Sequence, residues 1–338
     1  MPKIKVSIVG VGGYTGLELV KLLLNHPVFE LKAVFATEEN DEISNIHPSL
    51  KDTLSMPILQ ANIQNIIKVS DLVFLALPHK QAMEYAKPLH KEGIKIIDLS
   101  ADYRLSLETY EEYYCPHSDK ENLKSAVYGL PEYNRNIIKK ASLIANPGCY
   151  PTATLLAILP FIPYLDTAQT LYIDAKSGVS GAGKKLTASS QFVTINENLF
   201  AYSAINHRHS PEIKEQIQKI GKTQIKCLFV PHLIPITRGM LVSIFAKLKS
   251  PLNPLEILKQ HYKQEPFIRI YEKSSVQIKN VAGTHFCDIS AKTDEKDLFI
   301  TAAIDNLLRG ASSQALANAN LVCGLEESLG LPKIAYAP

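Results

Sequence analysis

One cysteine of the chain stands where a nucleophile would be expected. Cys149 follows the turn-forming pair Pro147-Gly148, and Pro151 comes two residues after it. Proline suits the first turn of a helix, where its missing N–H costs nothing, so we expect a helix to begin within a residue or two of Cys149. The free N–H groups and partial positive charge of a helix start favour a thiolate over a thiol. The stretch by itself leaves two interpretations open, a nucleophile or a buried structural cysteine.

Two histidines are candidates for proton transfer. His207 and His209 flank Arg208, and Ser210-Pro211 is a good helix start that would leave both histidines in the preceding loop. A single histidine is usually structural, but a pair beside an arginine and a helix cap favours general acid/base chemistry.

A glycine-rich stretch follows an expected strand in the second half of the chain. Residues 171–176 are predicted to form a strand, and residues 177–184 read Ser-Gly-Val-Ser-Gly-Ala-Gly-Lys. Such a stretch is either a flexible surface loop or a nest of backbone N–H groups, and beside Lys184 a nest would suit a phosphate. We interpret it as an anion site.

The N-terminal residues predict a site for a dinucleotide. A β-branched strand over residues 3–10 runs into glycines at positions 10, 13 and 16, and residues 17–24 have helical spacing. This order of strand, glycine loop and helix is the context that a phosphate-binding fingerprint requires. The glycines allow a tight turn and a close approach to a pyrophosphate, and the helix start supplies N–H donors for the anion.

The end of the second strand bears on the choice of cofactor. Residues 30–36 are predicted to form that strand, and its end is where the adenosine ribose should lie. The run Thr37-Glu38-Glu39 follows it. An acid at this place usually accepts the 2′-hydroxyl of NAD, whereas an arginine would favour the 2′-phosphate of NADP.

The order of the expected elements divides the chain into two domains. Further strands at residues 71–77 and 95–99, with a helix at 81–90 between them, predict a doubly wound parallel sheet. After residue 160 the pattern becomes mostly β, and a long helix over residues 301–323 is expected to dock back on the first domain. We therefore predict a dinucleotide-binding domain of residues 1–148 with 311–338, and a catalytic and oligomerisation domain of residues 149–310.

Composition limits the classes of function. The chain has 338 residues, 46% hydrophobic and 20% charged, which is ordinary for a globular protein of two domains. The formal net charge of +3 gives no argument for nucleic acid or a charged membrane surface. The five cysteines are scattered without a Cys-x-x-Cys pair, which indicates free thiols in a reducing compartment and no metal site. We expect a cytoplasmic protein without a targeting signal or membrane span.

A nicotinamide cofactor and a cysteine at a helix start together imply one type of reaction. Hydride does not attack a carboxylate, but a thiolate can displace the leaving group of an activated acyl compound and form a thioester that hydride reduces. A histidine then exchanges a proton with the hemithioacetal oxygen. A phosphate pocket around Lys184, Arg208 and the glycine-rich stretch makes an acyl phosphate the expected substrate.

Several motifs carry a resemblance to a known family. They include Asn-Pro-Gly-Cys-Tyr-Pro-Thr at residues 146–152, His-Arg-His-x-Pro-Glu-Ile at 207–213 and the glycine loop at 10–16. With these motifs the chain resembles, almost end to end, the N-acetyl-γ-glutamyl-phosphate reductases of arginine biosynthesis. The resemblance implies an α/β protein with a Rossmann-like doubly wound domain. It also implies an α+β catalytic and dimerisation domain like those of the aspartate-semialdehyde and glyceraldehyde-3-phosphate dehydrogenases.

The resemblance also implies the reaction. Such an enzyme reduces N-acetyl-L-glutamyl 5-phosphate with NADPH to N-acetyl-L-glutamate 5-semialdehyde and phosphate, through a thioester on Cys149. The protein would be a cytoplasmic homodimer or homotetramer. Two other interpretations stay open: a reductase of aspartyl or N-acetyl-aminoadipyl phosphate, and a cofactor-binding regulator without turnover.

The motifs and the resemblance together give an expected set of site residues. Cys149 is assigned as the nucleophile and His209 as the acid/base, with His207 as the alternative. NADP(H) binding is assigned to Gly10, Gly12, Gly13, Tyr14, Thr15, Gly16, Thr37, Pro78, Ser177, Gly178, Ser180, Gly181 and Asn306. Substrate or phosphate binding is assigned to Asn146, Lys184, Arg208, Glu212 and Arg104.

The chain departs from related families at two places. Where the reductases usually have Ser-Arg after the second strand, this chain has the run Thr37-Glu38-Glu39, so the local residues favour NAD while the resemblance implies NADP(H). Aspartate-semialdehyde dehydrogenases have a histidine after an Arg-Gly pair, but here Met240 follows that pair. The base is therefore expected from His207 or His209, and His209 is preferred because it lies next to Ser210.

Overall fold

The computed structural model describes residues 3–36 and 41–337, which form two compact units. The first unit contains the described residues up to Pro147 together with Ala311–Leu331, and the second contains Gly148–Gly310 and the residues from Pro332 on. Thr37, Glu38 and Glu39, on which the expectation for the cofactor depends, lie outside the described residues.

The last described residues pack with the second unit and not with the first domain, where the order of the expected elements predicts them. The N–H of His285 donates to the carbonyl oxygen of Pro332 at 2.8 Å, and the N–H of Tyr336 donates to that of Ala282 at 2.9 Å. These backbone hydrogen bonds fix the C-terminal segment to the second unit.

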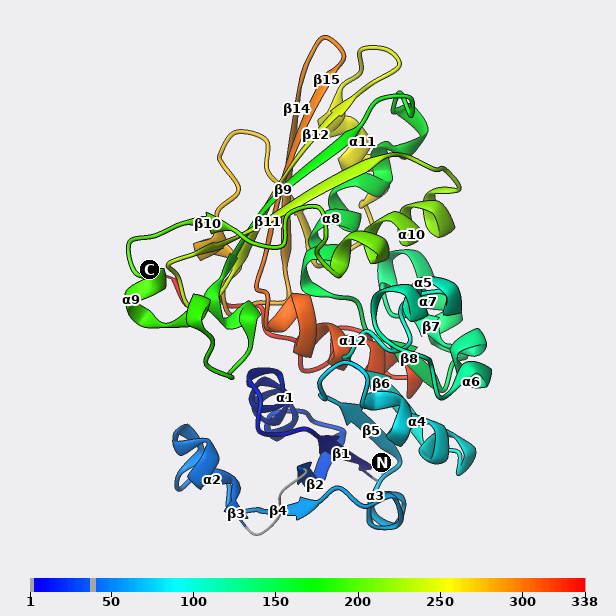
Figure 1. Cartoon of the computed structure of the whole chain (residues 1–338), viewed down its shortest axis with the longest axis vertical. Coiled ribbons are helices and arrows are strands. Elements are labelled where there is room, and N and C mark those ends of the chain that lie inside the picture. Colours follow the sequence, from blue (N-terminus) through cyan, green and yellow to red (C-terminus); the bar gives the residue numbers. More distant parts are fainter. Residues whose placement is uncertain (1–2, 37–40, 338) are drawn as a thin grey trace. The chain divides into compact units, whose positions relative to one another are not determined.

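Among the described residues, the first unit is built on an eight-stranded sheet of order β3-β4-β2-β1-β5-β6-β8-β7 (Figure 1). Neighbouring strands are parallel except β3 and β4. The chain winds to one side of β1 through β2 and to the other side through β5, which makes the fold doubly wound and places a ligand-binding edge at the carboxyl end of β1. The strands are β1 (Ile4–Val9), β2 (Phe29–Ala36), β3 (Asp41–Glu42), β4 (Pro57–Gln60), β5 (Leu72–Leu75), β6 (Lys95–Asp98), β7 (Val127–Tyr128) and β8 (Leu143–Ala145).

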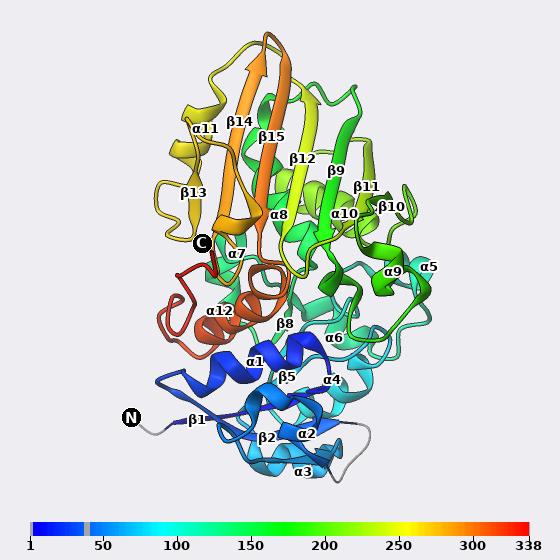
Figure 2. The same cartoon turned by 90° about the vertical axis from the view of Figure 1, so that its left-hand side faces the viewer.

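Helices cover both faces of this sheet. α3 and α4 pack on one face, in a core that includes Val73 and Ile96. α1 and α12 contact each other on the opposite face (Figure 2). The helices of the unit are α1 (Tyr14–Leu24), α2 (Ile43–Ile46), α3 (Ile63–Val69), α4 (Ala82–Lys91), α5 (Leu107–Tyr113), α6 (Lys120–Ser125), α7 (Pro131–Ile138) and α12 (Ser313–Val322).

In the described part of the chain, the second unit contains a seven-stranded mixed sheet of order β10-β11-β9-β12-β15-β14-β13 (Figure 2). α8 contacts β12 and β15, and α11 contacts β14. Burial alternates along β11 and β12, because every second side chain points away from these helices. The elements are α8 (Cys149–Ile158), β9 (Leu171–Gly178), α9 (Phe192–Ile195), β10 (Phe200–Ala201), α10 (His209–Gly221), β11 (Cys227–Ile234), β12 (Met240–Lys247), α11 (Pro254–His261), β13 (Ile268–Ile270), β14 (Cys287–Asp294) and β15 (Asp297–Ile304).

The prediction of one long helix over residues 301–323 is wrong. Its first residues belong to β15, and helical structure begins only with the π-helical turn Leu308–Ser312 that precedes α12. The Asp305 carboxylate accepts hydrogen bonds from the N–H groups of Leu307 and Leu308, at 2.9 and 3.0 Å. These bonds end the strand and start the helical turn, as a side-chain cap does.

Gly10 makes the tight turn after β1 and allows a test of the glycine loop. Its φ is +94°, and a Cβ there would lie 2.4 Å from the carbonyl oxygen of Ala76. Gly93, with φ +78°, has open space around it, so it is a matched control for positive φ alone. Gly93→Ala should cost about 1 kcal/mol, and Gly10→Ala about 3 kcal/mol because the backbone must also move.

The measurement is denaturant unfolding followed by circular dichroism, since the chain has no tryptophan. Equal losses of unfolding free energy in the two variants would show that the close approach of Gly10 to Ala76 is unimportant.

Candidate functional site

The candidate nucleophile is the first residue of a buried helix. α8 begins at Cys149 with Gly148 as its N-cap, so the expected helix start is confirmed. The carbonyl oxygen of Gly148 accepts hydrogen bonds from both the N–H and the hydroxyl of Thr152, each at 2.9 Å. All other residues of α8 are buried, whereas Cys149 is partly exposed. The thiol therefore lies at the positive end of a helix that the core holds in place.

Gly310 packs directly against Cys149. A Cβ at position 310 would lie 2.6 Å from the Cβ of Cys149 and 3.1 Å from its Cα. Distances this short do not occur in packed interiors, so a larger residue would displace the nucleophile. The π-helical turn before α12 carries Gly310, and such turns are frequent at functional sites.

His209 is the first residue of α10, with Arg208 as the N-cap. The expected start at Ser210 is wrong by one residue, and His209 lies in the helix instead of the loop. Ser210 does not act as the cap because its hydroxyl donates to the carbonyl oxygen of Ile205 (3.3 Å). That bond holds the preceding loop against the first turn of α10.

His207 stabilises the same loop. Its Nδ1 accepts a hydrogen bond of 3.1 Å from the N–H of His209. Its ring lies among those of Tyr150, Tyr202 and Phe229, with centroids 5.4 to 5.7 Å away. Burial, assisted by the charge of Arg208, lowers the pKa of His207 to about 4. A neutral imidazole with this pKa is a poor general acid at pH 7.

Two tyrosines beside the histidines were not identified from the sequence. The hydroxyl of Tyr150 lies 3.2 Å from that of Tyr202 and 3.3 Å from the carbonyl oxygen of His232. Burial raises the pKa of both, that of Tyr202 to about 12. Both phenols therefore stay protonated as hydrogen-bond donors. Tyr150 is next to Cys149 in the chain, but nothing in the sequence indicates that Tyr202 lies beside Tyr150.

The glycine-rich stretch does not form the predicted nest of free N–H groups. Four of its N–H groups donate to carbonyl oxygens at 2.9 to 3.1 Å, because the segment pairs with residues 236–239 and turns on itself. The Ser177 hydroxyl donates to the carbonyl oxygen of Gly178 (3.0 Å), and Lys184 is exposed. The four N–H groups are those of Gly178, Val179, Ser180 and Gly183.

Asn306 connects the predicted cofactor-binding loop at residues 177–181 to Gly239. Its Oδ1 accepts from the N–H of Gly239 at 2.6 Å, and its Nδ2 donates to Ser180 Oγ at 3.0 Å. A Cβ at Gly181 would lie 2.8 Å from Ser177 Oγ. These contacts fix the loop after β9, and binding of a cofactor by Ser177, Gly178, Ser180, Gly181 and Asn306 stays a prediction.

The glycine loop of the first unit fits a dinucleotide phosphate. A Cβ at Gly12 or Gly13 would meet nothing within 4 Å, so this part of the loop is open. Gly13 is the N-cap of α1, and the first turn, with Tyr14 and Thr15, directs its N–H groups toward the loop. A Cβ at Gly16 would lie 2.8 Å from the carbonyl oxygen of Gly10, which explains that glycine by close packing.

His47 supports this loop and was also missed. It is 4% exposed, and its Nε2 lies 2.8 Å from the carbonyl oxygen of Val11. It comes from the segment after α2, more than thirty residues from the loop, so no local pattern reveals the contact. Pro78, predicted to contact the cofactor, is exposed just after β5.

Two of the predicted substrate-binding residues are structural in the first unit. Asn146 is fully buried: its Nδ2 donates to the carbonyl oxygen of Ala311, and its Oδ1 accepts from Asn318. Arg104 is 5% exposed and donates to the carbonyl oxygens of Asn146 and Leu99, each at 2.7 Å. The side chain of Asn146 and the Nε and one terminal nitrogen of Arg104 are therefore engaged within the first unit, and substrate binding by either residue stays a prediction.

Glu212, another predicted substrate-binding residue, is buried in the second unit. It is 1% exposed, and its Oε1 accepts a hydrogen bond of 2.9 Å from the N–H of Gly148. Its binding of the substrate or its phosphate stays a prediction. Arg208 is exposed at the start of α10, and its role in substrate or phosphate binding stays a prediction.

Two features are absent from residues 3–36 and 41–337. No helix there is long and apolar enough to cross a membrane. No group of three or more His, Cys, Asp or Glu residues there is arranged to hold a metal ion.

Both halves of the chain match models of semialdehyde dehydrogenase domains. The NAD binding domain matches residues 5–141, and the dimerisation domain matches residues 149–306.

Full-length relatives decide the family. N-acetyl-gamma-glutamyl-phosphate reductase of Wolinella succinogenes is 60% identical over 338 residues, all of both chains. The proteins of the same name from Sulfurovum sp. (57% identical) and Campylobacter curvus (58% identical) cover at least 99% of each chain. The chain belongs to the N-acetyl-gamma-glutamyl-phosphate reductase family. The resemblance drawn from the motifs is confirmed.

Solved structures confirm the fold of this family member. Aspartate semialdehyde dehydrogenase II of Vibrio cholerae superposes with a TM-score of 0.74 at 15% identity, covering 96% of this chain and 99% of the other. The Candida albicans aspartate semialdehyde dehydrogenase, solved with NADP, gives 0.69 at 14% identity, covering 95% and 99%. The predicted α/β class, with a doubly wound domain and an α+β domain, is confirmed.

The lowered pKa of His207 predicts a pH dependence of stability. Because the unfolded chain binds a proton near pH 6.5 and the folded one only near pH 4, unfolding takes up protons between these values. The free energy of unfolding should therefore fall as the pH drops from 6.5 to 4. At pH 4.5 the loss from this group should be about 2 kcal/mol.

His207→Asn keeps an acceptor for the N–H of His209 and removes the titration. Denaturant unfolding of both proteins at pH 7.5 and 4.5 should give a loss on acidification that is smaller in the variant by that amount. Parallel losses would show that His207 does not titrate with a depressed pKa.

Proposed function

We propose that this protein reduces N-acetyl-L-glutamyl 5-phosphate to N-acetyl-L-glutamate 5-semialdehyde and phosphate, with NADPH, in arginine biosynthesis. The carrying observation is a partly exposed cysteine at the start of α8, in a chain 57–60% identical to proteins named for this reductase. The chemistry needs a nucleophile, a proton donor and a hydride donor, and each has a candidate.

Cys149 forms the acyl-enzyme. Its thiolate attacks the acyl carbon, the bond from that carbon to the phosphate oxygen breaks, and phosphate leaves with the electron pair. The start of α8 stabilises the thiolate. Arg208 and Lys184, both exposed cations in the second unit, are the proposed contacts for the departing phosphate.

His209 is the proposed acid/base. When bound, the nicotinamide supplies the hydride that reduces the thioester carbon. The imidazolium of His209 gives its proton to the carbonyl oxygen, which becomes the hydroxyl of a hemithioacetal on Cys149. His209 takes that proton back as the carbon–sulfur bond breaks, which releases the aldehyde and restores the thiolate. The low pKa and loop contacts of His207 support this division of roles.

NADP(H) is the proposed cofactor, held by the glycine loop and the start of α1. The open space at Gly12 and Gly13 and the helix start support phosphate binding there. By their place in the sequence, after the second strand, Glu38 and Glu39 are expected to repel a 2′-phosphate; both lie outside the described residues. Water reduces such a repulsion between exposed charges to about 1 kcal/mol. We therefore expect NADPH to be preferred, but with weaker discrimination against NADH than an arginine would give.

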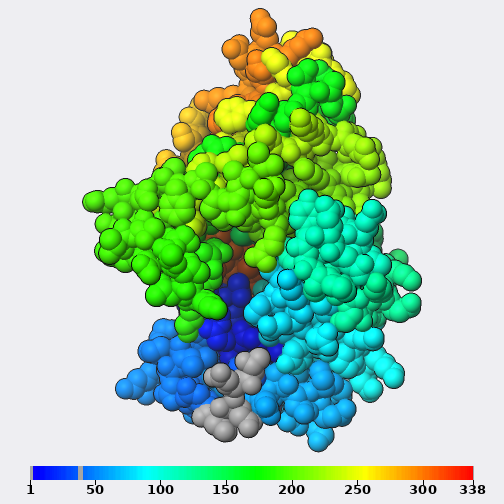
Figure 3. Space-filling view, viewed as in Figure 1, coloured from blue at the N-terminus to red at the C-terminus, as the bar shows by residue number. Residues whose placement is uncertain are grey.

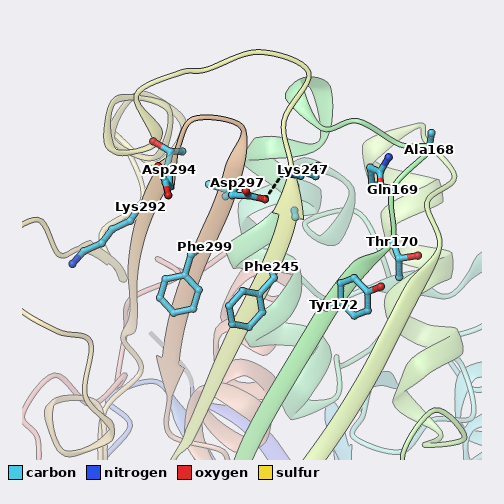
Figure 4. A pocket seen from close by; sticks show the side chains of 13 residues that line it. Ala168, Gln169, Thr170, Tyr172, Phe245, Lys247, Lys292, Asp294, Asp297 and Phe299 are labelled. Carbon is cyan, nitrogen blue, oxygen red and sulfur yellow. Dashed lines mark ion pairs between the residues drawn. The ribbon is translucent and has the colours of Figure 1, made fainter.

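A homo-oligomer, either a dimer or a tetramer, is proposed to form through the open face of the second unit's sheet. Tyr172 pairs with Phe245 and Phe245 with Phe299 across β9, β12 and β15, which makes a continuous aromatic row. Tyr172 and Phe245 are 50% and 48% exposed. Figure 4 shows the row at the floor of a hollow of about 590 Å³ that Thr170 and Lys247 also line.

A segment at the edge of the same sheet also carries exposed apolar side chains. Residues 183–206 include the edge strand β10 and are seen at the left of Figure 3 in green. Exposed apolar surface can mark an interaction site. Both surfaces lie in the part matched by the dimerisation domain, which supports a second copy of the chain as the occupant. The exposed apolar residues are Leu186, Phe192, Val193, Leu199 and Ile205.

The cytoplasm is the proposed location of the protein.

Variants of Cys149 and His209 test the proposed chemistry. Cys149→Ala and Cys149→Ser should abolish reduction of N-acetylglutamyl phosphate and leave NADPH binding intact. His209→Asn should lower kcat by about 10²–10⁴-fold with little change in KM. Wild-type protein is assayed with NADPH and NADH in parallel. In a separate experiment the protein is mixed with the acyl phosphate without reductant, and mass spectrometry should show the acyl group on Cys149. Appreciable activity of Cys149→Ala would disprove the mechanism, and full activity of His209→Asn would place the base elsewhere.

The aromatic row predicts the effect of a charge on assembly. Phe245→Lys should dissociate the oligomer, because the ammonium would have to be desolvated in the interface. Sedimentation velocity gives the mass of the wild type and the variant at the same concentration. Tyr113→Lys is the control, since Tyr113 is 40% exposed on α5 in the first unit. An unchanged mass for Phe245→Lys would exclude this face as the interface.

A further inference from the structure

A buried carboxylate joins the two helix starts that carry Cys149 and His209. Glu212 lies in the first turn of α10, three residues after His209, and is almost completely buried. Its hydrogen bond of 2.9 Å goes to the N–H of Gly148, the residue that precedes Cys149. One side chain therefore connects the beginning of α10 to the beginning of α8.

We propose that Glu212 is a positioning residue for the nucleophile: it fixes the peptide that enters α8 and thereby the direction of the Cys149 side chain relative to the start of α10. This inference rests on the proposed role of Cys149. It replaces the expectation that Glu212 binds the substrate.

Both peptide groups that flank the Cα of Gly148, the residue before Cys149, are held by hydrogen bonds. Glu212 accepts from the N–H of Gly148, and Thr152 donates to its carbonyl oxygen through both its N–H and its hydroxyl. In addition, Gly310 lies so close to Cys149 that a Cβ would not fit. A glycine is the most flexible residue, so Gly148 depends on these contacts for a single conformation.

The cost of burial argues that the carboxylate has a specific role. Removing an ionised carboxylate from water is unfavourable unless hydrogen bonds compensate it, and an apolar side chain would fill the space without that cost. The first turn of α10 offsets part of the cost through its positive end. A negative charge beside the nucleophile does not favour a thiolate, so attraction of charge does not explain the residue. The residue is explained instead by its acceptor oxygen, which lies 2.9 Å from the backbone nitrogen of Gly148.

Three variants separate the acceptor from the charge. Glu212→Gln keeps the acceptor oxygen and removes the charge, Glu212→Asp keeps the charge and withdraws the oxygen by one methylene, and Glu212→Ala removes both. A displacement of about 1 Å can cost about 10²-fold in rate. We expect kcat to fall about 10–100-fold in the aspartate and alanine variants. KM and the Kd for NADPH should stay within about threefold, and the glutamine variant should stay near the wild type.

Glu215→Gln is the matched control. Glu215 lies on the same helix, one turn away, in an ion pair with Lys219. The variant makes the same chemical change as Glu212→Gln and should leave kcat and KM unchanged.

A second measurement does not depend on the substrate. The rate at which iodoacetamide alkylates Cys149, followed by mass spectrometry of its peptide, should change at least threefold in the aspartate and alanine variants and not in the glutamine variant. If the wild type fails to reduce the acyl phosphate, the proposed function falls, while this comparison still decides the role of Glu212.

Two results would overturn the inference. An active aspartate variant with an inactive glutamine variant would show that the charge matters and not the position of the acceptor. A rise in KM at constant kcat in any Glu212 variant would return Glu212 to substrate binding.

Discussion

The main constraint on the second unit is that the Cys149 sulfur must lie at the start of α8. In the proposed mechanism a thiolate is stabilised there by the backbone N–H groups of the helix start, whose effect fades within one turn of the helix. The helix must therefore begin at Cys149 and not a turn later. Burial of every following residue of α8 makes this beginning immobile, and the helix contacts β12 and β15 of the sheet below it. Thr152 and Glu212 hold the backbone of Gly148 by hydrogen bonds, and Gly310 packs against Cys149.

The same principle explains why the proposed acid/base is also the first residue of a helix. His209 begins α10, and its N–H is bonded to the ring of His207. A loop histidine would need other contacts to hold its ring at one place. Here the start of α10 positions His209, and the neutral, half-buried ring of His207 holds its N–H in place. The two histidines of one motif thus have different physical roles, one determined by burial and the other by the helix start.

Local patterns were sufficient to predict some features and not others. The helix start at Cys149, the glycine loop and the doubly wound sheet follow from turn formers, glycines and apolar runs that lie within a few residues of one another. The start of α10 was misplaced because Ser210 has the type of a cap but bonds to Ile205 instead. The strand at residues 301–304 was taken for helix because its alanines suit either structure and its pairing partners are distant in the chain. The burial of Asn146 and the contact of His47 with the glycine loop depend on tertiary packing, which a single sequence does not display.

The return of α12 to the first unit has a consequence for synthesis of the protein. This helix carries Gln314 and Asn318, whose side chains donate to the carbonyl oxygen of Gly129, and it contacts β6 and α7. The ribosome makes the sheet of the first unit early, but it reaches α12 only after the whole second unit. At about 5–20 residues per second this delay is roughly 10–30 s. During that time one face of the nascent sheet has α1 but lacks α12, and the apolar surface left exposed is the kind that chaperones bind. The nascent chain should thus depend on such help most strongly before residue 322 has left the exit tunnel.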